Sequence, residues 1–244
     1  DKLRDMQKKM RDNKVSAKVT ENVMYRYWDR WLTDGYYPRL FALELESREV
    51  VDLMPHTSNY FGMMGGASYD ISPDGKTIAM AMNTTEPPYE STHYNIFLLS
   101  TDGSGNMQSI TEENPADDSN PVFSPDGRYI LYGKQSIHHF YADKMVMTIY
   151  DRQANTHREL TSDIDLSCAE WFWSKDGQSI FFHAEDRAMR SLFRIPASGG
   201  IYEELFRGGI NSGSSLSGAQ HIIFNHRNLS QPAELFRLHL TGRH

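Results

Sequence analysis

The chain has 244 residues, which is enough for one all-β domain with a substantial core. Its 39% hydrophobic and 23% charged residues are typical of a water-soluble globular domain, and no run approaches the ~18 apolar residues of a membrane span. The formal net charge of −7 is spread along the chain, which disfavours a phosphate backbone as a partner. We therefore expect no membrane span and no nucleic-acid binding.

The first part of the chain predicts a lead-in followed by strands. Residues 1–18 are rich in Lys and Arg and poor in large apolar side chains, so we expect a helical or flexible segment. Residues 23–28 are a candidate strand, while 40–45 and 50–53 are predicted third and fourth strands of a partial blade over 19–56. No basic-then-apolar leader opens the chain, and we expect the natural N-terminus to lie upstream. Periplasm and cytoplasm both stay open as compartments, since the single cysteine, Cys168, decides neither.

A short phrase, Ser-Pro-Asp-Gly between two β-rich runs, recurs along the chain. Copies begin at Ser72 and Ser124; a third, Ser-Lys-Asp-Gly, begins at Ser174, and an eroded fourth surrounds Gly218. Proline presets φ at the second turn position, aspartate tolerates the third, and glycine supplies the positive φ that returns the chain to a strand. Each copy is therefore predicted to join two strands of a hairpin.

The spacing of this phrase identifies the fold class. Its glycines fall at 75, 127, 177 and 218, so the intervals are 52, 50 and 41 residues. These intervals match the roughly 40–50 residues of a four-stranded propeller blade. Later apolar runs, such as 95–99 and 145–150, predict a third strand of each blade, and short segments ending near 111 and 161 predict a fourth. We predict an all-β chain that forms a β-propeller of four-stranded blades.

The predicted blades are unequal. Whole blades are expected over 66–111, 118–161 and 166–206, with a second partial blade over 210–241. About five blades are then present. An open propeller would leave unpaired strand edges and an exposed core. We therefore expect the chain to be part of a larger propeller, with a closed five-bladed ring as the alternative.

Two flanking motifs carry a family resemblance. Residues 18–31, with 34–35 and 39–41, resemble a stretch midway through the propeller of dipeptidyl and acylaminoacyl peptidases, and residues 224–238 resemble their last blade. Together with the repeat copies between them, these matches cover most of residues 18–241. The chain thus resembles the β-propeller domain of the prolyl oligopeptidase family of serine peptidases. The repeat taken alone also resembles the propellers of Tol-Pal type periplasmic proteins.

The resemblance implies a non-catalytic role for this chain. It implies a propeller that gates and positions short peptides for an α/β-hydrolase domain of the same polypeptide, with earlier blades ahead of residue 1 and a Ser-Asp-His triad in the hydrolase. No G-x-S-x-G sequence occurs, and the nearest serine-rich stretch, 213–218, has the wrong spacing. We therefore predict no catalytic residue in this chain.

Charged and aromatic residues interleave at Arg26, Trp28, Asp29 and Trp31, where an apolar strand would suffice. An Arg–Asp pair at a domain interface would be structural, whereas side chains directed into a chamber would bind a peptide terminus through charge-assisted hydrogen bonds. These four residues are the candidate substrate-binding residues. Trp171 and Trp173 share one face of a predicted strand and are interpreted as packing between blades.

Two other function classes stay open. An interaction propeller of Tol-Pal type would bind protein or glycan through its loops, and a metal-dependent polysaccharide lyase would need a histidine site assembled from distant loops. The ten histidines include no H-E-x-x-H motif, and His138-His139 falls in a predicted loop. Residues 102–106 are interpreted as a turn rather than a calcium loop. We predict no metal site and no cofactor.

Overall fold

A computed structural model describes residues 2–14, 17, 19–21, 25–27, 30–31, 39–57, 61, 67–86 and 91–241. Its elements are α1 (Lys2–Asp12), β1 (Arg26–Tyr27), β2 (Arg30–Trp31), β3 (Phe41–Leu43), β4 (Val50–Asp52), β5 (Ser68–Ile71), β6 (Thr77–Asn83), β7 (Tyr94–Ser100), β8 (Met107–Ser109), β9 (Asp118–Phe123), β10 (Tyr129–Lys134), β11 (Val146–Asp151), β12 (Thr156–Glu159), β13 (Cys168–Trp173), β14 (Ser179–Asp186), β15 (Met189–Pro196), β16 (Glu203–Phe206), β17 (Ile210–Ser217), β18 (His221–Asn228) and β19 (Gln231–His239).

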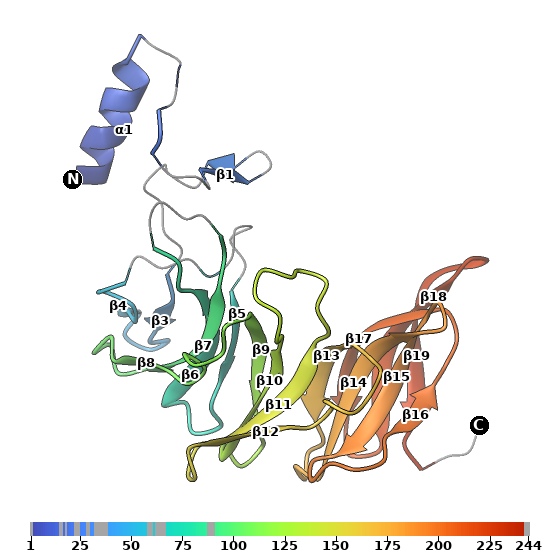
Figure 1. Cartoon of the computed structure of the whole chain (residues 1–244). Coiled ribbons are helices and arrows are strands. Elements are labelled where there is room, and N and C mark those ends of the chain that lie inside the picture. Colours follow the sequence, from blue (N-terminus) through green and yellow to red (C-terminus); the bar gives the residue numbers. More distant parts are fainter. Residues whose placement is uncertain are drawn as a thin grey trace.

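Strands that follow one another in the chain pair side by side. β5–β8, β9–β12 and β13–β16 each form four antiparallel strands, and β17–β19 form three, joined to β15 by one parallel bridge between Arg190 and Ile210. β1–β2 and β3–β4 are separate two-stranded hairpins. The sheets stand in a row, with β3–β4 at one end and β17–β19 at the other (Figure 1). The predicted fold class is confirmed; the division into blades stays our interpretation.

The repeated turns join the first and second strands of their sheets, as predicted. In the second copy the Ser124 hydroxyl donates to Asp126 Oδ1 (2.6 Å) and accepts from the Tyr129 amide (2.8 Å). Gly127 has a φ of 71°, and the same hydrogen bonds recur at Ser72 and Ser174. The serine therefore stabilises the turn, because its hydroxyl donates to the aspartate carboxylate and accepts from the backbone amide five residues further on.

Core packing occurs between successive sheets. One buried cluster joins β3–β4 to β5–β8, a second joins β5–β8 to β9–β12, a third joins β9–β12 to β13–β16, and a fourth joins β13–β16 to β17–β19. The second strands β6, β10 and β14 are almost completely buried because a sheet covers each of their faces. In contrast, β12 is exposed along its whole length. Burial of both faces in the middle strands explains why the central residues of these strands are mostly apolar.

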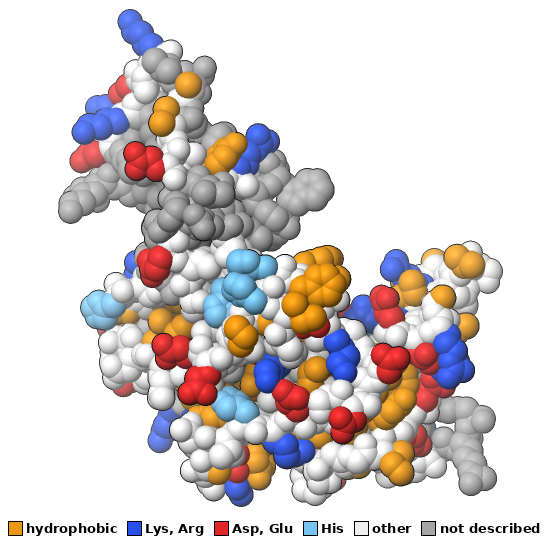
Figure 2. Space-filling view, in the orientation of Figure 1, with side chains coloured by type: hydrophobic (Ala, Val, Ile, Leu, Met, Phe, Trp, Pro, Cys, Tyr) orange, Lys and Arg blue, Asp and Glu red, His pale blue; other side chains and the backbone are white. Residues whose placement is uncertain are grey.

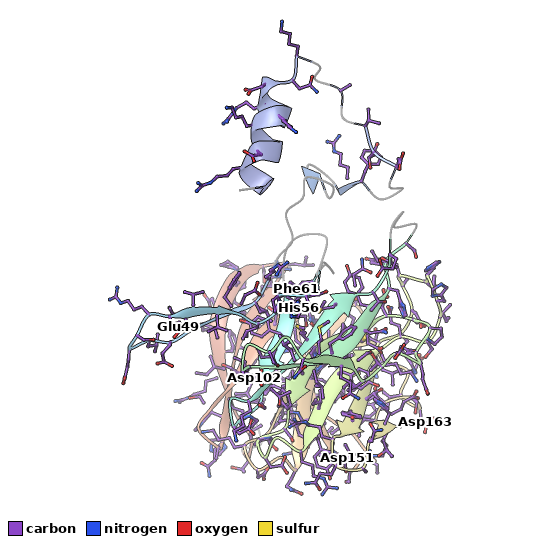
Figure 3. The ribbon with its side chains drawn as sticks, turned by 90° about the vertical axis from the view of Figure 1, so that its left-hand side faces the viewer. Glu49, His56, Phe61, Asp102, Asp151 and Asp163 are labelled. Atoms are coloured by element: carbon purple, nitrogen blue, oxygen red, sulfur yellow. The ribbon has the colours of Figure 1, made fainter. Side chains whose placement is uncertain are left out.

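The two ends of the sheets differ in character. We call the end that carries the Ser-Pro-Asp-Gly turns the turn face; it is the lower end in Figure 1. The opposite end, where the first strands begin and where β6 and β10 end, is the loop face. Figure 3 shows Phe61 and His56 toward the loop face and Asp151 at the turn face. The hairpin that carries Glu49 extends away from the sheets in the same view.

The first strands of neighbouring sheets lie next to one another. The Phe123 amide of β9 donates to Asp70 Oδ2 of β5 (2.7 Å), and the Gly213 amide of β17 donates to Glu170 Oε2 of β13 (2.7 Å). These bonds cross from one sheet to the next. β5, β9, β13 and β17 therefore form the inner edge of the row, and their starting residues meet at the loop face.

Candidate functional site

The structure describes only part of the predicted substrate-binding set. Arg26 is an exposed residue of β1, and its Cα lies opposite that of Trp31 in the β1–β2 hairpin. Trp28, Asp29 and the side chain of Trp31 lie outside the described residues. A role for these four residues in binding substrate stays a prediction.

The two tryptophans of β13 pack between sheets, as predicted. Trp171 and Trp173 are 5% and 7% exposed and belong to the cluster between β9–β12 and β13–β16. The Trp171 indole donates to the carbonyl of Asn120 (2.9 Å), and that of Trp173 to the carbonyl of Val122 (3.3 Å). Both rings thus fasten β13 to the neighbouring first strand, which leaves no exposed ring face for stacking a ligand.

Between these tryptophans and the loop face, β13 contains a β-bulge that presents a carboxylate. Glu170 has a φ of 47°, and Asn120 at the matching position of β9 has a φ of 50°. The strand register shifts in both sheets beside these residues. Non-glycine residues rarely adopt this conformation, and bulges redirect side chains where a site needs them. The side chain of Glu170 is 40% exposed at the inner edge.

Glu170 connects three strands. Its Oε1 lies 3.0 Å from Arg190 Nη2 of β15, and its Oε2 accepts the Gly213 amide of β17 at 2.7 Å and lies 4.0 Å from His183 Nε2 of β14. These contacts hold the carboxylate in one orientation. The arrangement provides a partly exposed carboxylate acceptor at the inner edge, with lone pairs left for an incoming donor.

A serine and a histidine lie in contact beside Glu170. His183 Nε2 is 2.8 Å from Ser214 Oγ, and the imidazole is completely buried. Burial lowers the pKa of His183 to about 4, and the positive charge of Arg190 acts in the same direction. The geometry is not a catalytic triad, because Glu170 approaches the nitrogen that faces the serine and Nδ1 has no carboxylate among the described residues. Ser214 is therefore a structural hydroxyl.

A second polar network lies at the loop-face end of β9. Asn114 Nδ2 donates to Asp118 Oδ1 (2.9 Å) and to the carbonyls of Ala116 and Gln135 (both 3.1 Å). Asp118 is completely buried. Burial raises the pKa of Asp118 to about 7, although hydrogen bonds from Thr111 and Asn114 act against this. The Asn114 side chain therefore joins Asp118 and the connection before β9 to the loop after β10.

Sequence reasoning missed both carboxylates, and one signal was available. Aligning the repeat copies on their serines places Ser68, Asn120 and Glu170 at one position, four residues before the serine. All three are polar, and Asn120 and Glu170 are each followed directly by a buried residue. The contacts of Glu170 with Arg190, His183 and the Gly213 amide come from other strands and have no counterpart in local sequence.

Two kinds of site were also sought in the described residues. No group of three or more His, Cys, Asp or Glu side chains is placed there to hold a metal ion. In the same part of the chain, no helix is both long and apolar enough to cross a membrane.

Comparison with known proteins shows which proteins have a similar sequence. The chain is 28% identical over 204 residues to a probable dipeptidyl-peptidase 5 of Arthroderma benhamiae, covering 75% of this chain and 28% of that protein. It is 28% identical over 207 residues to dipeptidyl-peptidase 5 of Aspergillus fumigatus, covering 75% and 29%. The chain is a β-propeller related to the propeller domain of dipeptidyl-peptidase 5, a peptidase that belongs to the prolyl oligopeptidase family. It spans less than a third of the length of these relatives, and no family model matches it.

Solved structures agree on the fold. TolB from Acinetobacter baumannii superimposes with a TM-score of 0.60 at 16% identity, covering 84% of this chain and 46% of TolB. Puromycin hydrolase gives 0.62 at 16% identity, with 83% and 33% covered. Oligogalacturonate lyase in complex with manganese gives 0.57 at 17% identity, with 83% and 54% covered. Because these identities are low, the three neighbours establish the propeller fold alone.

Proposed function

We propose that this chain is the non-catalytic propeller portion of a dipeptidyl peptidase, and that it admits and positions short peptides for a separate α/β-hydrolase domain of the same polypeptide. The relationship to dipeptidyl-peptidase 5 across 75% of the chain carries this proposal. The isolated Ser214–His183 pair supports it, because a buried imidazole with a lowered pKa is a poor general base and the nucleophile must then come from elsewhere.

Labelling of the full-length protein with a fluorophosphonate tests whether the catalytic serine lies in a domain other than this propeller. We expect the reagent to modify a serine in a G-x-S-x-G sequence outside residues 1–244 and to leave Ser214 unmodified. Mass spectrometry of the labelled peptides identifies the site. A protein in which no serine is modified would instead be an interaction propeller, and modification of Ser214 would contradict our interpretation of that hydroxyl.

Within this proposal, Glu170 contacts the substrate. A dipeptidyl peptidase cleaves its substrate close to a free terminus. An ammonium terminus pairs best with an ionised carboxylate that is already held in the right orientation. Glu170 is such a carboxylate: it is fixed by Arg190 and the Gly213 amide, remains 40% exposed, and lies at the inner edge. We assign the ammonium terminus of the peptide to this side chain.

The variant Glu170→Gln in the full-length protein tests this assignment. We expect KM for a dipeptidyl substrate with a free amino terminus to rise about tenfold, which is about 1.4 kcal/mol and typical of one charge-assisted hydrogen bond. For the same substrate with an acetylated terminus, KM should be the same for the variant and the parent protein. Glu203→Gln is the matched control, since Glu203 also pairs with an arginine, Arg194, but lies on the outer strand β16. Equal losses for both substrates would show a structural role only.

A further inference from the structure

The loop between β10 and β11 exposes three large apolar side chains. Ile137 is 53% exposed, Phe140 50% and Tyr141 96%. The stretch 137–141 contains no Asp, Glu, Lys or Arg; its other members are His138 and His139. Figure 2 shows hydrophobic side chains gathered beside histidines above the β9–β11 region, at the loop face. We call residues 137–141 the apolar loop.

The backbone of this loop is held by its own hydrogen bonds. Asp143 Oδ2 accepts the amides of Ser136 (2.7 Å) and Ile137 (2.8 Å). The Gln135 side-chain amide donates to the carbonyl of Asp143 at 3.0 Å, and the Phe140 amide donates to the carbonyl of Ile137 at 3.2 Å. These hydrogen bonds fix the backbone of the loop. The loop keeps its apolar side chains directed at solvent, which costs free energy unless a partner covers them.

Neighbouring connections fix where the loop lies. His138 Nδ1 donates to the carbonyl of Pro115 (2.5 Å), in the connection before β9. Lys144 Nζ donates to the carbonyls of Ser162 (2.7 Å) and Ile164 (3.1 Å), in the connection before β13. The loop is therefore tied on both sides and is presented as one preformed surface.

The apolar loop also lies at the same face as the candidate substrate contact. The Cys168 amide donates to the carbonyl of Met145, so the end of the loop is bonded to β13 two residues before Glu170. A catalytic domain that acts on a peptide held by Glu170 must approach this face. Interface cores favour aromatic side chains and few charges, which is the composition of residues 137–141.

We propose that the apolar loop is the docking surface for the peptidase domain of the same polypeptide, with Phe140 and Tyr141 as its anchoring side chains. The inference rests on the proposed function. In the related dipeptidyl-peptidases the matched region is 28% or 29% of the protein, so the remainder is large enough to cover this surface. Buried aromatic anchors of this kind carry much of the binding energy at protein interfaces.

Photo-cross-linking of the full-length protein tests the docking surface. We expect p-benzoylphenylalanine in place of Tyr141 to cross-link to residues of the peptidase domain in the same molecule. The same probe in place of Ile201, which is 92% exposed in the β15–β16 connection at the turn face, should not. Mass spectrometry identifies the linked peptides. Cross-links between two copies of the protein, or no cross-link from position 141, would overturn the inference.

A functional measurement separates docking from folding. The double variant Phe140→Ser, Tyr141→Ser should keep the far-ultraviolet circular dichroism of the parent but cleave long peptides more readily relative to short ones, because a loosened interface excludes them less well. Ile201→Ser is the control and should leave this ratio unchanged. An unchanged ratio in the double variant contradicts the inference. Fluorophosphonate labelling of the same samples shows whether a peptidase domain is present, so failure of the docking surface and failure of the proposed function are distinguished.

Discussion

Replacing Trp171 by alanine is expected to lower the free energy of unfolding by about 3–5 kcal/mol, the usual cost of removing a large buried aromatic side chain. The ring is 5% exposed between two sheets, and its indole donates to the carbonyl of Asn120 on the neighbouring first strand. It fills the space above Gly133, where an added Cβ would lie 2.4 Å from Trp171 Cη2. The loss should therefore come from packing and from an unsatisfied carbonyl together.

Urea-induced unfolding followed by circular dichroism measures this effect. The control is Trp171→Phe, which keeps most of the volume and loses the hydrogen bond, so its loss should be smaller. A cost below about 1 kcal/mol for the alanine variant would be outside the range for a buried aromatic residue. It would contradict the conclusion that this ring fastens the two sheets together.

The second large effect concerns Asp118. The variant Asp118→Asn is expected to raise the free energy of unfolding at pH 8 by up to about 4 kcal/mol. The pKa of Asp118 is about 7 in the folded protein and ordinarily 3.8, and each pKa unit between the two values corresponds to about 1.36 kcal/mol. The unfolded chain releases this proton near the ordinary pKa of 3.8, whereas the folded protein keeps it up to about pH 7. The parent protein therefore loses stability as pH rises from about 4 to 7, and asparagine does not.

Chemical denaturation at several pH values between 4.5 and 8 checks this sign. The difference between variant and parent should grow with pH and level off above about pH 7. His183 acts oppositely, because its folded pKa of about 4 makes stability rise with pH up to about 6.5. Comparing the variant with its parent removes that contribution. A difference of the same size at pH 4.5 and pH 8 would show that Asp118 is ionised throughout.

Local sequence predicts a large part of this fold for a clear reason. Turn chemistry acts within four residues, so Ser124, Asp126 and Gly127 specify their hairpin wherever the chain lies. The apolar runs at 95–99 and 145–150 become the third strands β7 and β11, because an apolar run of this length is also a local signal. The alternation of Trp171 and Trp173 also predicts correctly that one face of their strand packs inward.

The candidate site depends on neighbours that no local pattern contains. Glu170 meets Arg190 on β15 and the Gly213 amide on β17, 20 and 43 residues further along the chain. The pKa of Asp118 is raised by burial, in a network where Asn114 bonds both Asp118 and the carbonyl of Gln135, 21 residues further along the chain. Neither side chain differs in sequence from an ordinary exposed carboxylate, so only burial and cross-strand contacts reveal them.

The amino-acid sequence by itself determined the repeat, its hairpin turns, the all-β propeller class and the absence of a nucleophile elbow, because each follows from residues close together in the chain. Tertiary structure decided which polar residues meet at the inner edge, which aspartate is buried, and which loop presents apolar side chains to solvent. Those outcomes depend on how one sheet packs against the next. The interactions between sheets join residues that are tens of positions apart in the chain. A pattern of neighbouring residues therefore does not reveal them.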